Sequence, residues 1–367
     1  MKNNKFLRHI VIAIILSLGV MWSFSSAAEK KVGYPNDQFI ASAQWLKTHK
    51  EDKDVVVVDV RAGEHFDGSL IPGSVHMPWS LFRYNDVGKN LAVTFVGVQA
   101  AQKILGGHGI TPRDTVVLYD SVAEDGGATA SYVFWALDVL GHEKKMILER
   151  GIDSWKDAGF ERVTTPRQTQ PLFYQVPSKN IAKEKLIDGD FVYNRLGDYY
   201  YQIIDVRSVE EYSGKKGTKG LDGSPLKLGH IPTAVNINYV AAWTDGQSKN
   251  IKSYAELQSL YAGLDSSKGI ILYCNSGRRS SFSYYILRLM GFSNVYTYEP
   301  SWKEWGNPDN YFPVETLENV LESTVLPQPS GSTASVKTTA NGQKGKTPTS
   351  VPNTANEPSG GYVSCGG

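Results

Sequence analysis

Four blocks of sequence occur twice in the same order, and this internal repeat limits the possible fold more than any other feature. VVVVDVRAGEHF at 55–66 is matched by QIIDVRSVEEY at 202–212, and TVVLYD at 115–120 is matched by GIILYC at 269–274. Two further pairs are LIPGSVHMPW with HIPTAVNINY, and LERGIDSWKDAGF with TYEPSWKEWGN. Ordered repeats of this kind indicate a duplicated domain, and a chain of 367 residues is long enough to hold two.

Each repeat has the pattern of an α/β unit. Short apolar runs rich in β-branched residues are typical of buried parallel strands, and they occur at Val55–Asp59, Thr115–Tyr119, Ile203–Asp205 and Ile270–Tyr273. Two later stretches have helical spacing and end before a glycine; they are Thr129–Leu140 and Ser281–Met290. The predicted fold class is therefore α/β, with two tandem domains, each a parallel β-sheet flanked by helices.

The N-terminus has the layout of a secretory signal peptide. Lys2, Lys5 and Arg8 precede an apolar run at 10–20, and small residues follow it up to Ala28. This order predicts a signal peptide at 1–28 with cleavage near Ala28, and a periplasmic or secreted mature protein without a stable membrane span. An uncleaved membrane anchor is the alternative, but the apolar run is short for a span.

Changes in composition divide the rest of the chain. We expect a first domain at 36–163, a linker rich in Pro, Gln and Thr at 164–180, a second domain at 181–325 and a tail at 326–367. The tail has almost no large apolar residues, so it is predicted to be flexible.

Charge and cysteine content argue against several classes of function. The net charge is +1 and no basic stripe stands out, so nucleic acid is not an expected partner. The chain has two cysteines, Cys274 and Cys365, too few for a disulfide framework or a cysteine-based metal site. We therefore expect neither a metal nor another cofactor.

Cys274 lies in the stretch YCNSGRRSS at 273–281, between a predicted strand and a predicted helix. A thiol reacts as its thiolate, and three features favour a lowered thiol pKa. The helix dipole points its positive end at the sulfur, Gly277 lets backbone N–H groups converge on it, and Arg278 and Arg279 add positive charge. A buried structural cysteine is the alternative, but it does not require the glycine and the arginines. We therefore interpret Cys274 as a nucleophile.

The order of these motifs resembles the rhodanese family in its tandem two-domain form. The shared motifs are D-x-R, G-H-I-P, Y-C-x-x-G-x-R and a segment with tryptophans, and the resemblance extends over 36–325. It implies a sulfurtransferase in which Cys274 takes up a sulfane sulfur as a persulfide. It also implies a loop that cradles the sulfur and the donor's anionic end, and a D-x-R pair that supports this loop. The loop residues are Asn275, Ser276, Gly277, Arg278 and Arg279, and the pair is Asp205 and Arg207.

The first repeat departs from this pattern at the position of the nucleophile. Asp120 stands where Cys274 stands in the second repeat. Aspartate forms no persulfide, and its carboxylate repels an anionic donor. The first domain is therefore expected to be catalytically silent and to form one wall of the active site. Asp125, Gly126 and Gly127 are expected to be turn residues.

The sequence restricts the donor and acceptor only in part. Two arginines in the loop suit a small dianion, so thiosulfate or polysulfide is the first expectation and 3-mercaptopyruvate the second. Glu211 stands where some relatives carry a donor-binding arginine, which is a departure from the usual pocket. The expected acceptor is a thiophile such as cyanide or a protein thiol.

Two other functions stay open at this point. One is a non-enzymatic persulfide carrier or binding scaffold of the cell envelope, in which turnover is incidental. The other is a cysteine-based phosphatase or arsenate reductase, which requires a Cys-x5-Arg loop. Arg279 gives Cys-x4-Arg instead, and this shorter loop favours a sulfur atom over a phosphate group.

The chain ends in GGYVSCGG, which resembles the C-terminal arm of sulfur-oxidation carrier proteins. A flexible linker of roughly 35 residues has an end-to-end distance of about 30–35 Å, long enough for Cys365 to reach Cys274. The hypothesis is that Cys365 is a sulfur-carrier arm that exchanges sulfur with Cys274. An unused tail cysteine, or one that forms a disulfide, is the alternative.

Overall fold

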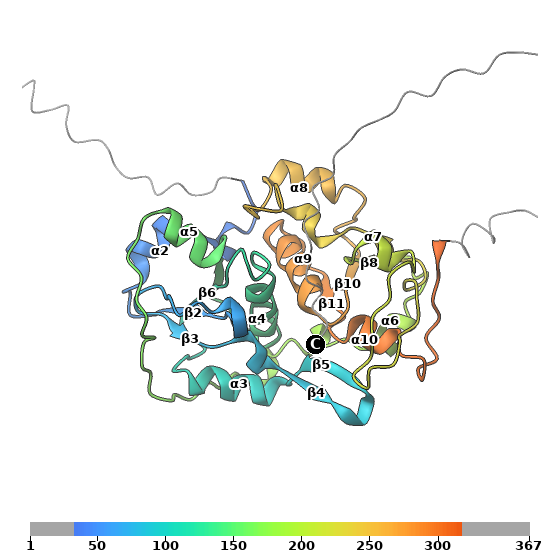
Figure 1. Ribbon diagram of the computed structural model, residues 1–367, viewed down its shortest axis with the longest axis horizontal. Helices are drawn as coiled ribbons and strands as arrows, with labels where there is room; N and C mark the ends of the chain where they lie inside the picture. The colour runs from blue at the N-terminus through green and yellow to red at the C-terminus, as the bar shows by residue number, and fades with distance from the viewer. Residues whose placement is uncertain (1–32, 318–367) are drawn as a thin grey trace, which may run out of the picture.

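The computed structural model describes residues 33–317, which form two α/β domains that lie side by side (Figure 1). The predicted signal peptide, the predicted tail and Cys365 lie outside these residues. Between residues 33 and 317, no helix combines the length and the apolar character needed to cross a membrane. The predicted fold class is confirmed, because each domain is built on a parallel sheet with helices against it.

The first domain contains a five-stranded sheet with the order β1-β7-β6-β2-β3, and all its pairings are parallel. All five residues of the central strand β2 are buried, as expected of a parallel strand covered on both faces. The strands are β1 (Ile40–Ala41), β2 (Val55–Asp59), β3 (Val75–His76), β6 (Thr115–Tyr119) and β7 (Lys145–Leu148).

The second domain contains a four-stranded sheet with the order β11-β10-β8-β9, again with parallel pairings only. Tyr273 at the end of β10 lies beside Asp205 at the end of β8. The D-x-R pair and the cysteine loop therefore leave the sheet at the same edge. The strands are β8 (Tyr201–Asp205), β9 (Val235–Asn236), β10 (Gly269–Tyr273) and β11 (Val295–Thr297).

Nine α-helices and seven short 3-10 helices occur in the described part of the chain. The α-helices are α2 (Ala43–His49), α3 (Val98–Gly107), α4 (Ala128–Val139), α5 (Gly151–Asp157), α6 (Gly189–Tyr193), α7 (Val209–Tyr212), α8 (Tyr254–Leu260), α9 (Arg278–Leu289) and α10 (Ser301–Trp305). The 3-10 helices are η1 (Asp37–Phe39), η2 (Gly63–His65), η3 (Trp79–Phe82), η4 (Val87–Lys89), η5 (Ser178–Asn180), η6 (Lys183–Lys185) and η7 (Tyr239–Ala242).

Helix α9 begins three residues earlier than the sequence pattern indicated. It starts at Arg278 rather than Ser281, because Gly277 adopts a φ of 86° and turns the chain directly from the loop into the helix. Arg278 and Arg279 therefore belong to the first helical turn, at the positive end of the helix dipole.

Helices α4 and α9 pack against each other at the centre of the interface between the domains (Figure 1). The rings of Phe134 and Tyr285 meet edge to face at 5.2 Å. The Tyr284 hydroxyl donates a hydrogen bond to Asp138 across the interface at 2.5 Å, and Lys145 lies 2.7 Å from the same carboxylate. One hydrophobic cluster includes residues of both domains, so the two repeats share a core.

An antiparallel hairpin of the first domain reaches over the second domain. It consists of β4 (Arg83–Asp86) and β5 (Leu91–Phe95). Strand β5 contacts α10 (Figure 1), and Asn90 in the hairpin turn accepts a hydrogen bond from the N–H of Asp222 at 3.2 Å. The sequence analysis did not predict this hairpin, which brings first-domain residues close to the loop that contains Cys274.

The segment predicted as a linker, 164–180, packs on the first domain. Its backbone at Leu172 donates a hydrogen bond to the carbonyl of Gly106 at 2.8 Å, and the Tyr174 hydroxyl lies 2.9 Å from His142 Nδ1. The connection between the two repeats is therefore held against α3 and the end of α4.

Candidate active site

Cys274 directly follows β10, and the loop after it leads into α9. Its backbone is held by the segment at the start of α10: its N–H donates to Ser301 Oγ at 3.1 Å, and its carbonyl accepts from the N–H of Trp302 at 3.1 Å. The residue is 1% exposed, and its thiol is free of any disulfide. A free thiol is thus held at the edge of the sheet where strand, tight loop and helix meet, as the sequence predicted.

The electrostatic environment of Cys274 favours its thiolate. Burial raises the pKa of the thiol, but favourable interactions outweigh it, so that the pKa is lowered from its ordinary value. The largest of these is the charge of Arg279, followed by the N–H groups of Ser280 and Ser276 and the Ser280 hydroxyl. The converging amides and Arg279 follow the sequence prediction, whereas Ser280 was not expected to take part. The arrangement prepares Cys274 to react as a nucleophile.

Arg279 forms a two-pronged ion pair with Glu211 of α7. Its Nη1 donates to Glu211 Oε2 at 2.8 Å, and its Nη2 donates to Glu211 Oε1 at 2.9 Å. Asn275 also donates its side-chain N–H to Glu211 Oε1 at 3.2 Å. Burial acts to raise the pKa of the Glu211 carboxyl, but Arg279 outweighs it and holds the pKa at about 2. Glu211 therefore orients two residues of the loop.

Replacing Glu211 with glutamine is expected to lower the free energy of unfolding by about 2–4 kcal/mol near neutral pH, because the Arg279 charge loses its partner. The folded-state pKa of Glu211 lies below its ordinary value of 4.5. Its stabilisation is therefore present above that pH and is lost as the pH falls towards 2. Denaturant unfolding of both proteins across this pH range measures the difference. Glu210→Gln is the control because Glu210 is exposed, and an equal loss there would contradict this assignment.

Arg278 pairs with the first domain. Its Nη2 lies 3.2 Å from Asp125 Oδ2, and the same carboxylate accepts a hydrogen bond from the Tyr239 hydroxyl at 3.0 Å. Asp125 has a φ of 92° and is followed by two glycines with positive φ, so this segment is the turn that the sequence predicted. The two loop arginines thus have different roles: Arg279 stabilises the thiolate, and Arg278 joins the loop to the first domain.

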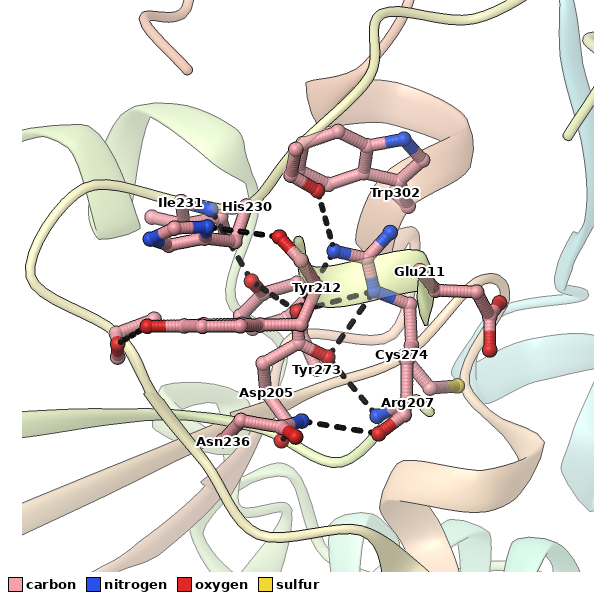
Figure 2. A network of polar contacts seen from close by, with 12 residues as sticks. Asp205, Arg207, Glu211, Tyr212, His230, Ile231, Asn236, Tyr273, Cys274 and Trp302 are labelled. Carbon is pink, nitrogen blue, oxygen red and sulfur yellow. Dashed lines mark hydrogen bonds and ion pairs between the residues drawn. The ribbon is translucent and has the colours of Figure 1, made fainter. Parts of the chain in front are cut away.

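The Asp205–Arg207 pair is buried next to the strand that carries Cys274 (Figure 2). Arg207 Nη2 donates to Asp205 Oδ2 at 2.6 Å, and the guanidinium stacks on the Trp302 ring at 4.2 Å. The Tyr273 hydroxyl donates to the same Asp205 oxygen at 2.6 Å. Because Tyr273 precedes Cys274, the pair lies where it supports the start of the loop.

Asp120 occupies the position of Cys274 in the first domain, and its carboxylate takes up the hydrogen-bond donors around it. The N–H groups of Gly127 and Ala130 donate to it at 3.0 and 3.1 Å, and the Thr129 hydroxyl donates at 2.8 Å. Burial raises the pKa of Asp120 to about 6 in spite of these bonds. A carboxyl group fills the position where the second domain carries sulfur, which supports a silent first domain.

Glu299 is a site residue that the sequence analysis missed. It is 4% exposed, and its carboxylate accepts hydrogen bonds from Thr94 Oγ1 at 2.9 Å, the N–H of Phe95 at 3.2 Å and the Tyr132 hydroxyl at 2.7 Å. All three donors belong to the first domain. A Cβ atom on Gly277 would lie 2.9 Å from Glu299 Cγ. The hairpin and α4 therefore hold a side chain that packs directly against the loop.

Gly277→Ala is expected to destabilise the protein by about 1–3 kcal/mol and to slow alkylation of Cys274 by iodoacetamide about tenfold. The reason is twofold: φ at this position is 86°, and the new Cβ would press against Glu299. Gly223→Ala is the matched control, since Gly223 has a φ of 82° and no atom within 4 Å of a built Cβ. Equal effects on alkylation in the two variants would contradict a role of the Glu299 contact.

Residues 42–158 and 189–308 each match the Rhodanese-like domain. The chain belongs to the rhodanese family. A curated relative of this rhodanese, the thiosulfate sulfurtransferase of Corynebacterium glutamicum, is 29% identical over 299 residues, which cover 78% of this chain and 93% of that protein. The sulfur carrier protein TtuD of Thermus thermophilus is 30% identical over 285 residues, which cover 75% of this chain and 96% of that protein. This rhodanese is a sulfurtransferase.

Solved structures with the same fold as this rhodanese include an anaerobic ergothioneine biosynthesis enzyme from Chlorobium limicola in complex with trimethyl histidine. That enzyme has a TM-score of 0.64 and 24% identity, covering 77% of this chain and 71% of that chain. A persulfide form of the enzyme EanB with ergothioneine has a TM-score of 0.66 and 22% identity, with the same coverage. At this level of identity the likeness establishes the fold alone.

Proposed function

We propose that Cys274 carries sulfane sulfur as a persulfide from an anionic donor to a thiophilic acceptor. With thiosulfate, the Cys274 thiolate attacks the outer sulfur, a new S–S bond forms, and sulfite leaves with the electron pair of the bond that breaks. Cyanide or a protein thiolate then attacks the outer sulfur of the persulfide, and the Cys274 thiolate is the leaving group. The cycle needs no external oxidant or reductant.

The observation that carries this proposal is the lowered pKa of a free thiol at the start of a helix. The N–H groups of Ser276 and Ser280 and the charge of Arg279 stabilise negative charge on the Cys274 sulfur. The same donors are suited to a persulfide anion, which places its charge one atom further out. Asn275 and Gly277 complete the loop, the first through Glu211 and the second by allowing its sharp turn.

Thiosulfate or polysulfide is the donor that we propose, ahead of 3-mercaptopyruvate. The relative from Corynebacterium glutamicum is named a thiosulfate sulfurtransferase, and the cationic surroundings of the loop suit a small dianion. Steady-state rates with cyanide as the acceptor test this order. We expect kcat/KM for thiosulfate to exceed that for 3-mercaptopyruvate about tenfold or more, and the reverse order would reject the donor assignment.

A sulfur-carrier function is the second candidate, because one relative is named a sulfur carrier protein. An enzyme reloads Cys274 from excess thiosulfate and forms thiocyanate over many cycles, whereas a carrier that receives its sulfur only from a partner protein releases about one equivalent per loaded thiol and is not reloaded by thiosulfate. Product formation that ends at one equivalent would favour the carrier.

Export from the cytoplasm is a further part of the proposal, and it concerns residues outside 33–317. The signal-like layout of the N-terminus supports it. Cell fractionation and the N-terminal sequence of the mature protein test it. We expect a mature N-terminus near Ala28, and a cytoplasmic protein that retains residues 1–28 would reject it.

Cys365, also outside the described residues, is proposed to be a carrier arm that accepts sulfur from Cys274. The glycine-flanked cysteine at the end of a low-complexity tail supports this role. Peptide mapping after loading with a donor is expected to find sulfur at both cysteines. Unchanged sulfur delivery to a protein thiol by a Cys365→Ala variant would reject the arm.

A further inference from the structure

Both arginines of the Cys274 loop are bound to carboxylates. Arg279 is engaged by Glu211, and Arg278 is paired with Asp125. Each of these pairs offsets much of the charge that a loop arginine offers to an incoming anion. A donor with a doubly charged end therefore requires positive charge from elsewhere.

Two other cationic residues contact the loop backbone from outside it, Arg83 through its guanidinium and Lys303 through its backbone amide. Arg83, at the start of the hairpin, donates from Nη2 to the Ser276 carbonyl at 2.5 Å. Lys303 of α10 donates its backbone N–H to the Asn275 carbonyl at 3.0 Å. One of these residues comes from each domain, and each forms a hydrogen bond with one of the two residues that directly follow Cys274.

Arg83 is held in a fixed orientation. Its guanidinium lies 4.9 Å from the Trp79 ring centroid and 5.1 Å from the Tyr132 ring centroid. It also donates from Nε to the Val93 carbonyl at 2.8 Å. No ion pair of Arg83 with a carboxylate occurs among residues 33–317, and the carboxylate on which its charge acts most clearly is that of Glu299. Glu299, whose pKa responds to Arg83, has its oxygens bonded to donors of the first domain, and burial raises its pKa.

Lys303 is a partly buried ammonium group bound to a neutral partner. Its Nζ donates to the Lys219 carbonyl at 2.5 Å, and no ion pair of Lys303 occurs in the part of the chain that the structure describes. Burial lowers the pKa of Lys303, and the charge of Arg83 lowers it further, which places the two cations within electrostatic reach of each other. An anion bound between them would relieve this repulsion.

We propose that Arg83 and Lys303 form an anion subsite beside the Cys274 loop, built from both domains, which binds the sulfonate end of the sulfur donor. The inference rests on the proposed function, since it assigns the anionic part of the same donor to these two residues. The first domain then contributes a substrate-binding residue in addition to a wall. The subsite supplies the charge that Glu211, in place of an arginine, does not supply.

The test compares alkylation of Cys274 by anionic iodoacetate and neutral iodoacetamide, followed on the Cys274 peptide of the full chain. The ratio of the two rates cancels the fraction of thiolate and reports the local charge. Lys303→Gln is expected to lower the iodoacetate-to-iodoacetamide ratio about three- to tenfold and to raise KM for thiosulfate about tenfold, with kcat nearly unchanged. Lys303→Arg is expected to keep the wild-type ratio.

Arg83→Gln is the second variant and is expected to lower the same ratio. Lys268→Gln is the matched control, because Lys268 precedes β10 and lies at the opposite end of the strand from Cys274. Wild-type ratios in both Lys303→Gln and Arg83→Gln would overturn the subsite. Failure of the proposed function gives a different result, namely no sulfur on Cys274 of the wild-type protein, whatever the alkylation ratios.

Discussion

Cys274→Ala is expected to lower the rate of thiocyanate formation from thiosulfate and cyanide by at least ~10³-fold. The proposed cycle passes through a covalent bond to this sulfur, and neither the loop amides nor the arginines replace it. Initial rates at saturating thiosulfate measure the effect. Asp120, the residue at the corresponding position of the first domain, bears a carboxyl group and offers no second nucleophile.

The control for this variant is Cys365→Ala, because Cys365 is the other cysteine of the chain. With cyanide as the acceptor, its rate is expected to remain within about twofold of the wild type. Substantial turnover by Cys274→Ala, or a loss of similar size in Cys365→Ala, would contradict the assignment of Cys274 as the nucleophile.

Arg207→Met is expected to lower the free energy of unfolding by about 3–5 kcal/mol, because it leaves the fully buried Asp205 carboxylate without its partner. The side chains of Asp205 and Arg207 are 0% and 2% exposed, so water does not replace the lost ion pair. We also expect alkylation of Cys274 to slow about tenfold, since Tyr273 is anchored to the same carboxylate. Denaturant unfolding and iodoacetamide kinetics measure the two effects.

The duplication provides the matched control. Arg61 pairs with Asp59 in the first domain at the same 2.6 Å separation, with exposures of 1% and 0%. Arg61→Met is expected to destabilise the protein to a similar extent but to leave the alkylation rate of Cys274 close to wild type. Equal slowing in both variants would show that Arg207 acts through global stability and not through the loop.

Much of the fold followed from local patterns in the sequence. The central strands and helices α4 and α9 were predicted because buried β-branched runs and helical periodicity are local signals. The loop was recognised for the same reason, since Cys274, Gly277 and Arg279 lie within six residues. The early start of α9 was missed because it depends on the positive φ of Gly277, which composition alone does not reveal.

The contacts that the sequence did not reveal join residues far apart in the chain. Glu211 pairs with Arg279 across 68 residues, and Arg83 reaches the Ser276 carbonyl across 193. The hairpin that carries Arg83 has short, partly exposed strands without clear alternation, so nothing in its pattern marks it. Glu299 likewise stands alone in the sequence, and its role depends on donors supplied by the other domain.

The central claim is that Cys274 becomes a persulfide, and the most direct measurement is the mass of the purified protein after incubation with thiosulfate. Peptide mapping of the loaded protein then locates the added sulfur. The account predicts one sulfur atom on the Cys274 peptide, removed by cyanide with formation of thiocyanate. No added sulfur on Cys274 from thiosulfate, polysulfide or 3-mercaptopyruvate would contradict it, even if the protein is folded and its thiol reacts with iodoacetamide.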